Sequence, residues 1–280
     1  MKFGMNLLLW TAETTEAHFP LLQRLKEYGF DGVELPLFGP PQPGVRAELD
    51  NLGLGRTAVC VCPAEANPID PDAAVRRAAV DFLKQRVDWC AELGVEILCG
   101  PIHSALGLLK GRGRTPEEWG WCVEVLREAS EHAGQAGVKL SVEPLNRFEV
   151  YFLNTNADAN RLVEEVGHPA LGYLYDSFHS NIEERDIYRS LVDNARGINH
   201  IHISENHRGT PGTGHIHWDA TFRAIKDSGY DGWLTIEAFG RALPELAAAT
   251  CIWRDLFDSE EDVARDGLRF MKNGWQTAAG

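Results

Sequence analysis

The 280-residue sequence is poor in basic residues: 27 Lys and Arg stand against 41 Asp and Glu, which gives a formal net charge of −14. A nucleic-acid groove or a contact with anionic membranes would need the opposite balance, so the charge favours a neutral small molecule as partner. The sequence also lacks an apolar run near the roughly 18 residues of a membrane span. The early apolar run 5–10 has too few basic residues before it for a secretory signal, and we expect a cytoplasmic protein.

The six cysteines form no CxxC pair, and most of them fall in apolar runs. This placement is typical of reduced core cysteines and again favours the cytoplasm. The sequence also lacks internal repeats, low-complexity tracts and Pro/Ser linkers, so we expect a single domain over residues 1–280. The cysteines are Cys60, Cys62, Cys90, Cys99, Cys122 and Cys251.

Short apolar runs alternate with longer amphipathic runs along the whole chain. Several amphipathic runs close on the glycine that commonly follows a helix. Eight βα units in series predict an α/β fold of the (β/α)8 TIM barrel class, with an extra C-terminal helix from Ser259 that packs across the bottom or makes a subunit contact. A doubly wound open sheet would normally carry a glycine-rich phosphate loop where this chain has Trp10 and TAETTEA. The expected strands are residues 3–10, 32–36, 57–62, 96–102, 139–143, 171–176, 198–204 and 233–239.

Four residues of metal-ligand type lie where four successive predicted strands end. They are Glu143 in SVEP, Asp176 in YLYDSFH, His202 in INHIHIS and Glu237 in WLTIEAF. Parallel strands of a closed barrel direct their last side chains toward one common mouth. The alternation within INHIHIS places His202 opposite the apolar Ile residues, so its side chain is expected to face the barrel axis.

Two Glu, one Asp and one His make an oxygen-rich set that suits Mn²⁺, Mg²⁺ or Co²⁺ better than a structural zinc. A divalent cation held in this way can chelate two adjacent oxygens of a sugar and stabilise an enediolate. Two glutamates on strands across the mouth can each exchange a proton with a bound carbon, one from each face. Two-sided proton transfer is what epimerisation requires.

These residues and their surroundings in EPLNRFE, DSFHSNIEE, HIHISENHRGTPGTGHIHW and GYDGWLTIEAF resemble the D-tagatose 3-epimerase family, which includes D-psicose and L-ribulose 3-epimerases. The resemblance implies a metal-dependent ketose 3-epimerase, with Mn²⁺ as the favoured metal and a dimer or tetramer as the assembly. It implies that Glu143, Asp176, His202 and Glu237 bind the metal and that Glu143 and Glu237 are also the acid and base. Residues at family-like spacing imply substrate contacts from Glu149, His179 and Arg208, and His103 just past the fourth strand is a further candidate.

Several alternatives stay open at this point. The same site would serve an isomerase of the hydroxypyruvate isomerase type or a keto-sugar lyase, and the loop with Lys110, Arg112 and Arg114 is basic enough to bind an anionic group or a larger substrate. An endonuclease IV-type enzyme shares the barrel but would need more His and Asp ligands and a basic face. A non-catalytic sugar-binding protein would not need two glutamates at the metal. The other nearby histidines, His200, His207, His215 and His217, are interpreted as core or loop residues rather than ligands.

Overall fold

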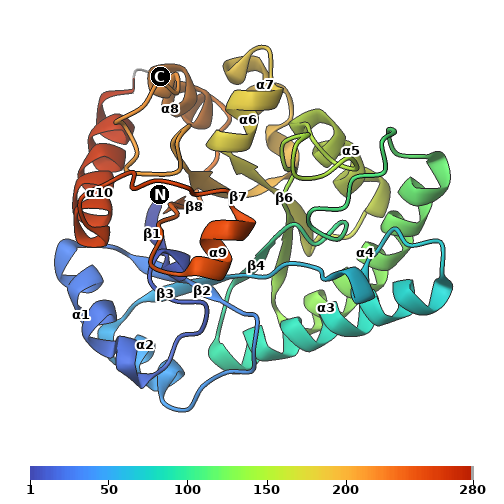
Figure 1. Cartoon of the computed structure of the whole chain (residues 1–280), viewed down its shortest axis with the longest axis horizontal. Coiled ribbons are helices and arrows are strands. Elements are labelled where there is room, and N and C mark those ends of the chain that lie inside the picture. Colours follow the sequence, from blue (N-terminus) through green and yellow to red (C-terminus); the bar gives the residue numbers. More distant parts are fainter. Residues whose placement is uncertain (279–280) are drawn as a thin grey trace.

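The computed structural model, which describes residues 1–278, is a closed barrel of parallel strands surrounded by helices (Figure 1). The strands pair in chain order and β8 closes the barrel by pairing with β1. This architecture confirms the predicted TIM barrel. The predicted domain over residues 1–280 also includes Ala279 and Gly280, which lie outside the described residues. The strands are β1 Lys2–Asn6, β2 Gly32–Pro36, β3 Gly55–Val59, β4 Ile97–Gly100, β5 Lys139–Val142, β6 Leu171–Asp176, β7 Ile198–Ile203 and β8 Trp233–Ile236.

The helices other than the short α9, which lies in the connection from β8 to α10, form the outer ring of the barrel. The predicted C-terminal helix is present as α10, and it packs beside α1 and α8 against β1 and β8 (Figure 1). It therefore takes the outer position of the eighth βα unit and does not cross the bottom of the barrel. The α-helices are α1 Phe19–Tyr28, α2 Val45–Leu52, α3 Ala73–Leu93, α4 Pro116–Ala136, α5 Asn156–Val166, α6 Ser177–Glu183, α7 Ile187–Asp193, α8 Trp218–Asp227, α9 Pro244–Ala249 and α10 Glu260–Thr277.

Several strands end earlier than the apolar runs that predicted them. β1 stops at Asn6, whose side-chain oxygen accepts the Leu8 backbone N–H at 2.8 Å, and a 3₁₀ turn, Leu7–Leu9, follows. An Asn that bonds the backbone two residues on offers the chain an alternative to the strand. β4 ends at Gly100, which has φ +123°, a conformation that only glycine adopts readily.

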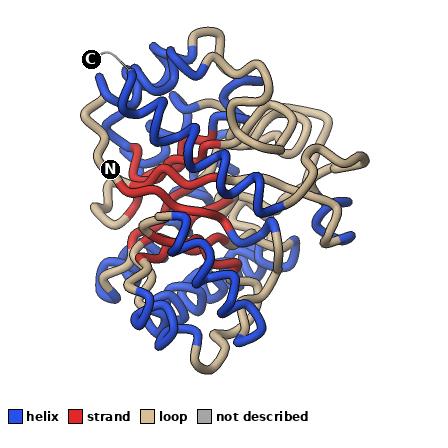
Figure 2. Tube along the Cα trace, turned by 90° about the vertical axis from the view of Figure 1, so that its left-hand side faces the viewer, coloured by secondary structure: helices blue, strands red, loops and turns tan. Residues whose placement is uncertain are grey.

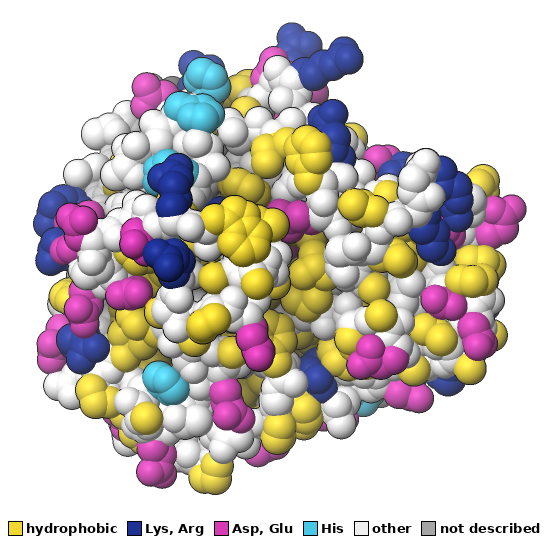
Figure 3. All heavy atoms as spheres, in the orientation of Figure 1, with side chains coloured by type: hydrophobic (Ala, Val, Ile, Leu, Met, Phe, Trp, Pro, Cys, Tyr) yellow, Lys and Arg dark blue, Asp and Glu magenta, His cyan; other side chains and the backbone are white. Residues whose placement is uncertain are grey.

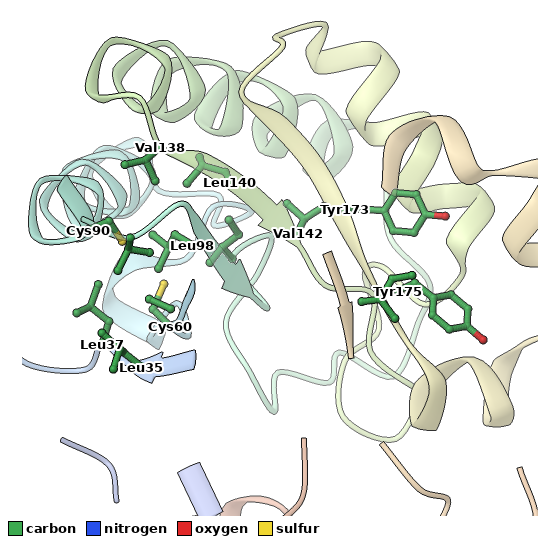
Figure 4. Packing of buried hydrophobic residues seen from close by; sticks show 14 of the residues in the cluster. Leu35, Leu37, Cys60, Cys90, Leu98, Val138, Leu140, Val142, Tyr173 and Tyr175 are labelled. Atoms are coloured by element: carbon green, nitrogen blue, oxygen red, sulfur yellow. The ribbon is translucent and has the colours of Figure 1, made fainter. Parts of the chain in front are cut away.

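Side chains alternate between the two faces of the barrel wall. Leu140, Val142, Tyr173 and Tyr175 pack outward in the layer between strands and helices (Figure 4). A smaller apolar cluster, which includes Trp233, fills the inside of the barrel. Because the strand positions between the outward residues face the axis, the same alternation brings the predicted ligands to the inside.

Trp233 plugs the end of the barrel where the strands begin. A Cβ atom at Gly32 or Gly55 would lie within 3 Å of the Trp233 ring, so these two positions require glycine. The loops at the opposite end are longer and project from the carboxyl ends of the strands (Figure 2). Within residues 1–278, no helix is both long and apolar enough to cross a bilayer. All six cysteines are free, and five of them are buried.

Candidate functional site

The four strand-end residues predicted as metal ligands meet at one point inside the barrel mouth. Asp176 ends β6 and His202 lies on β7, while Glu143 and Glu237 directly follow β5 and β8. Each offers one ligand atom, and these atoms all lie within 4.8 Å of one another. All four side chains are buried. We call these residues the four-ligand cluster.

Two atoms of the four-ligand cluster are buried without a hydrogen-bond partner. They are Oδ2 of Asp176 and Nδ1 of His202, which lie 3.7 Å apart. The other carboxylate oxygen of Asp176 accepts the backbone N–H groups of Phe178 and His179 at the start of α6, which fixes the direction of Oδ2. Buried polar atoms are almost always bonded in native proteins, so two orphaned ligand atoms facing each other fit a divalent cation.

The two glutamates of the cluster have opposite protonation preferences. Burial raises the pKa of Glu143 well above its ordinary value, and the nearby charge of Glu237 raises it further. Burial also acts on Glu237, but His202 and Arg208 outweigh it and lower the pKa of that carboxyl. Oε2 of Glu237 accepts a hydrogen bond from Nη1 of Arg208 at 2.6 Å. Two carboxyls with pKa values pushed apart are suited to act as acid and base.

His179 and Arg208 bring two hydrogen-bond donors to the same place. Nδ1 of His179 accepts the Asn146 backbone N–H at 3.0 Å, so in the neutral ring the hydrogen is on Nε2. That nitrogen lies 3.6 Å from Glu143 Oε1 and 3.0 Å from Nη2 of Arg208. Because both nitrogens then carry hydrogen, they do not bond each other, and each N–H group needs an acceptor. Burial lowers the pKa of His179 to about 3, so the ring is neutral at physiological pH. Two donors converging beside the glutamates can stabilise negative charge that develops on a substrate oxygen.

Arg208 adopts an uncommon backbone conformation at this position. Its φ of 64° lies in the left-handed region, which is costly for a residue with a side chain. The backbone is held there because its N–H donates to Glu205 O at 2.8 Å and its carbonyl accepts the Phe239 N–H at 2.9 Å. At the other end of the side chain, the guanidinium lies 3.7 Å from the centre of the Phe178 ring, a contact that holds the guanidinium in place.

A cavity of about 670 Å³ opens beside the four-ligand cluster, and Glu149 and Arg208 line it. Burial raises the pKa of Glu149, whose Oε1 accepts a hydrogen bond from Asn146 Nδ2 at 2.7 Å. Arg147 pairs with Glu183 rather than with Glu149, so Glu149 has no arginine partner next to it in sequence. The outer wall carries exposed aromatic side chains from Phe148 and Trp253. Apolar side chains gather around a central hollow on this face (Figure 3).

Glu34 on β2 is a site residue that the sequence reasoning missed. Its carboxylate is fully buried and lies on the far side of His202 from the four-ligand cluster, with Oε1 at 2.7 Å from Nε2 of His202. His200, for which the sequence predicts a core or loop position rather than a ligand role, is also buried, with Nε2 at 2.8 Å from Glu34 Oε2. The available signal was an acidic residue inside an otherwise apolar strand, GVELP.

His103 lies under the site instead of in the cavity wall. It is fully buried, its Nε2 is 2.9 Å from the Glu143 carbonyl oxygen, and its Nδ1 is 2.9 Å from Ser104 Oγ. The ring stacks on Phe152. These contacts indicate support for the backbone of Glu143, and the substrate contact suggested from sequence stays a prediction.

The burial of His103 makes protein stability depend on pH. Burial lowers the pKa of His103 from 6.5 to about 4. Below about pH 6.5 the histidine binds a proton in the unfolded chain but not in the folded chain, so acid favours unfolding. The measurement is the free energy of unfolding by urea at about pH 7 and at about pH 5, for wild type and for His103→Gln. Between these two pH values we expect wild type to lose about 2 kcal/mol more than the variant. Equal losses in the two proteins would contradict a neutral, buried His103.

The three basic residues of the loop before α4 are paired within the chain. Arg112 and Lys110 contact the buried carboxylate of Glu118, and Arg114 makes two bonds to Asp158 at 2.7 and 2.9 Å. Their charges are therefore largely neutralised by neighbouring carboxylates. The loop offers less to an anionic substrate than its sequence suggests.

Comparisons with known proteins agree with this geometry. Residues 22–274 match the family model of the xylose isomerase-like TIM barrel. A protein of Synechocystis sp. described as a probable ketose 3-epimerase is 32% identical over 280 residues, which cover 99% of this chain and 98% of that protein. The L-ribulose 3-epimerase of Mesorhizobium japonicum is 30% identical, with 99% of this chain and 95% of that enzyme covered. A solved structure of L-ribulose 3-epimerase superposes with a TM-score of 0.93 at 30% identity and the same coverage.

Proposed function

We propose a function on the premise that the chain belongs to the xylose isomerase-like TIM barrel family. The proposed function is that of an isomerase, a ketose 3-epimerase. It would interconvert the C3 epimers of a free ketose of the D-fructose/D-psicose, D-tagatose/D-sorbose or L-ribulose type. The observation that carries this proposal is the pair Glu143 and Glu237, whose buried carboxyls reach one site from β5 and β8. Relatives named as 3-epimerases that align over almost the whole chain support it.

Each glutamate has a defined part in the proposed reaction. The ionised Glu237 removes the C3 proton of one epimer, and the protonated Glu143 delivers a proton to the opposite face of the enediolate. The roles reverse for the other epimer. Arg208 and the Nε2–H of His179 donate toward the oxygen that gains charge, and Glu149 in the cavity wall orients the terminal hydroxyl of the sugar.

The donor set fits a divalent cation, with Mn²⁺ as the proposed metal and Co²⁺ or Mg²⁺ as alternatives. Glu143, Asp176, His202 and Glu237 would hold it, and the two orphaned ligand atoms of Asp176 and His202 support this assignment. When bound, such a cation supplies Lewis acidity that stabilises charge on the O2 and O3 oxygens of the sugar.

Labelling with solvent deuterium tests the proposal. Metal-supplemented protein incubated with D-fructose, D-tagatose or L-ribulose in D₂O is expected to form the C3 epimer with deuterium at C3. Deuterium at a terminal carbon or at C2 would instead indicate an aldose–ketose isomerase. Release of water or of an aglycone from a keto-sugar would indicate a lyase.

The proposal also includes the assembly, the cellular location and the partner of the enzyme. We propose a homo-oligomer, a dimer or tetramer, on the family resemblance, and sedimentation velocity tests it. The cytoplasm remains the proposed location, supported by the free, mostly buried cysteines. The net charge of −14 supports a neutral sugar rather than a nucleic acid as partner.

A further inference from the structure

The carboxylate of Glu34 is the centre of a buried hydrogen-bond network that spans the inside of the barrel. Its two oxygens receive donors from four strands, and every member of the network is at most 2% exposed. Oε1 faces Asn6 Nδ2 at 2.9 Å and His202 Nε2 at 2.7 Å. Oε2 faces Thr57 Oγ1 at 2.8 Å, His200 Nε2 at 2.8 Å and Cys99 Sγ at 3.2 Å.

This network leaves the carboxylate no freedom to rotate. An ionised carboxylate has about four lone-pair sites, and Glu34 has at least as many donors around it. An ionised carboxylate only accepts hydrogen bonds, so Nε2 of His202 carries a hydrogen. The remaining ring nitrogen, Nδ1, faces the four-ligand cluster at 3.3 Å from Glu237 Oε1 and 3.7 Å from Asp176 Oδ2.

Glu34, Cys99, His200 and His202 also form a second group of metal-ligand type. The distances decide between a hydrogen-bond network and a second metal site. Ligands about 2.0 Å from a tetrahedral zinc lie about 3.3 Å from one another. Both histidine nitrogens lie at 2.7–2.8 Å from Glu34 oxygens, which is hydrogen-bond distance.

We propose that Glu34 is the positioning residue for His202. By accepting the Nε2 hydrogen, it selects the ring nitrogen that faces the four-ligand cluster and fixes the angle of the ring. The inference takes that cluster as a metal site and to that extent rests on the proposed function. A carboxylate behind a ligating histidine also raises the basicity of the ligating nitrogen, and loss of such a partner typically weakens metal affinity about 10–100-fold.

The test is Mn²⁺ affinity of the metal-free full-length protein, measured by equilibrium dialysis without substrate. Glu34→Gln should weaken the affinity about 10–100-fold, because an amide offers one acceptor oxygen and turns two unwanted N–H groups toward the network. The matched control is Glu118→Gln, which makes the same change at another buried, multiply bonded glutamate, on the outer helix α4. Its Mn²⁺ affinity should stay at the wild-type value.

The outcomes separate this inference from the proposed function. Wild type that binds no Mn²⁺ would contradict the metal site itself. Wild-type affinity in a folded Glu34→Gln variant would overturn the positioning role while leaving the metal site in place. Two bound cations per wild-type chain would assign the Glu34 group to metal binding and overturn the role as well.

A measurement on wild type covers the case in which Glu34→Gln does not fold. In ¹⁵N-histidine NMR of the Mg²⁺-supplemented protein, His202 should show a slowly exchanging hydrogen on Nε2 and none on Nδ1. Assignment uses a His202→Asn variant, whose spectrum lacks that signal. A hydrogen on Nδ1 in place of Nε2 would overturn the inference.

Discussion

Glu237→Gln is expected to lower kcat for C3 epimerisation by at least about 10³-fold, and Glu143→Gln by a similar factor. An amide can neither take nor give the proton that the carboxyl exchanges with C3. The buried setting offers no substitute base at the same atom, because the cluster is closed to solvent and the neighbouring Arg208 is a permanent cation. The measurement is steady-state turnover with Mn²⁺ in excess, so that weakened metal binding is compensated.

Proton exchange adds a second readout to these two variants. A protein with one working glutamate can still remove and return the C3 proton on the face that this glutamate reaches. Each variant should therefore exchange C3 hydrogen with D₂O for one epimer and not for the other, without net epimerisation. Glu96→Gln, at an exposed carboxylate just before β4 at the opposite end of the barrel, serves as the control with unchanged turnover. Retention of most activity by metal-replete Glu237→Gln would exclude the two-base mechanism.

Local pattern was sufficient to predict the barrel and the convergence of its strand ends. In β7 the apolar Ile201 and Ile203 alternate with His200 and His202, and the structure places the isoleucines in the outer layer and both histidines inside. Period-two alternation needs no knowledge of distant residues. Alternation does not predict where a strand ends. β1 stops at Asn6 because the side chain of Asn6 bonds the backbone of Leu8.

The parts of the site that sequence could not supply are those that depend on partners far away in the chain. The Glu34 network joins residues 23 to 168 positions apart in sequence, and its pairing follows from barrel register. In the basic loop, a distant partner removes a predicted feature instead of adding one, because the charge of Arg114 is neutralised by Asp158 on α5. A charge in the sequence does not reveal whether a carboxylate will fold against it.

Removal of the divalent cation is expected to abolish turnover and to destabilise the fold. A ligand that binds only the folded state at about 100 times its Kd adds about 2.7 kcal/mol, which corresponds to a rise in Tm of roughly 5 °C for a chain of this size. We expect chelation to remove both the activity and this shift, and Mn²⁺ to restore them. Asp176→Asn replaces the carboxylate that carries one of the two orphaned ligand atoms with a neutral amide, and it should show no comparable Tm shift with Mn²⁺. Full turnover by a protein with no detectable metal would contradict the site assignment.

The same cluster predicts that metal affinity rises with pH. Without a cation, burial and Glu237 raise the pKa of Glu143. Burial opposes the charged form of His202, but Glu34 and Glu237 outweigh it and raise the pKa of that ring. The protonated ring holds a hydrogen on Nδ1 that a cation must displace, since an imidazole binds a metal through a deprotonated nitrogen, whereas Glu143 keeps the proton that it delivers in the proposed reaction. Calorimetric titration of Mn²⁺ in two buffers of different ionisation enthalpy should therefore report net proton release. Binding without net proton release would mean that Nδ1 of His202 already lacks a hydrogen in the metal-free protein.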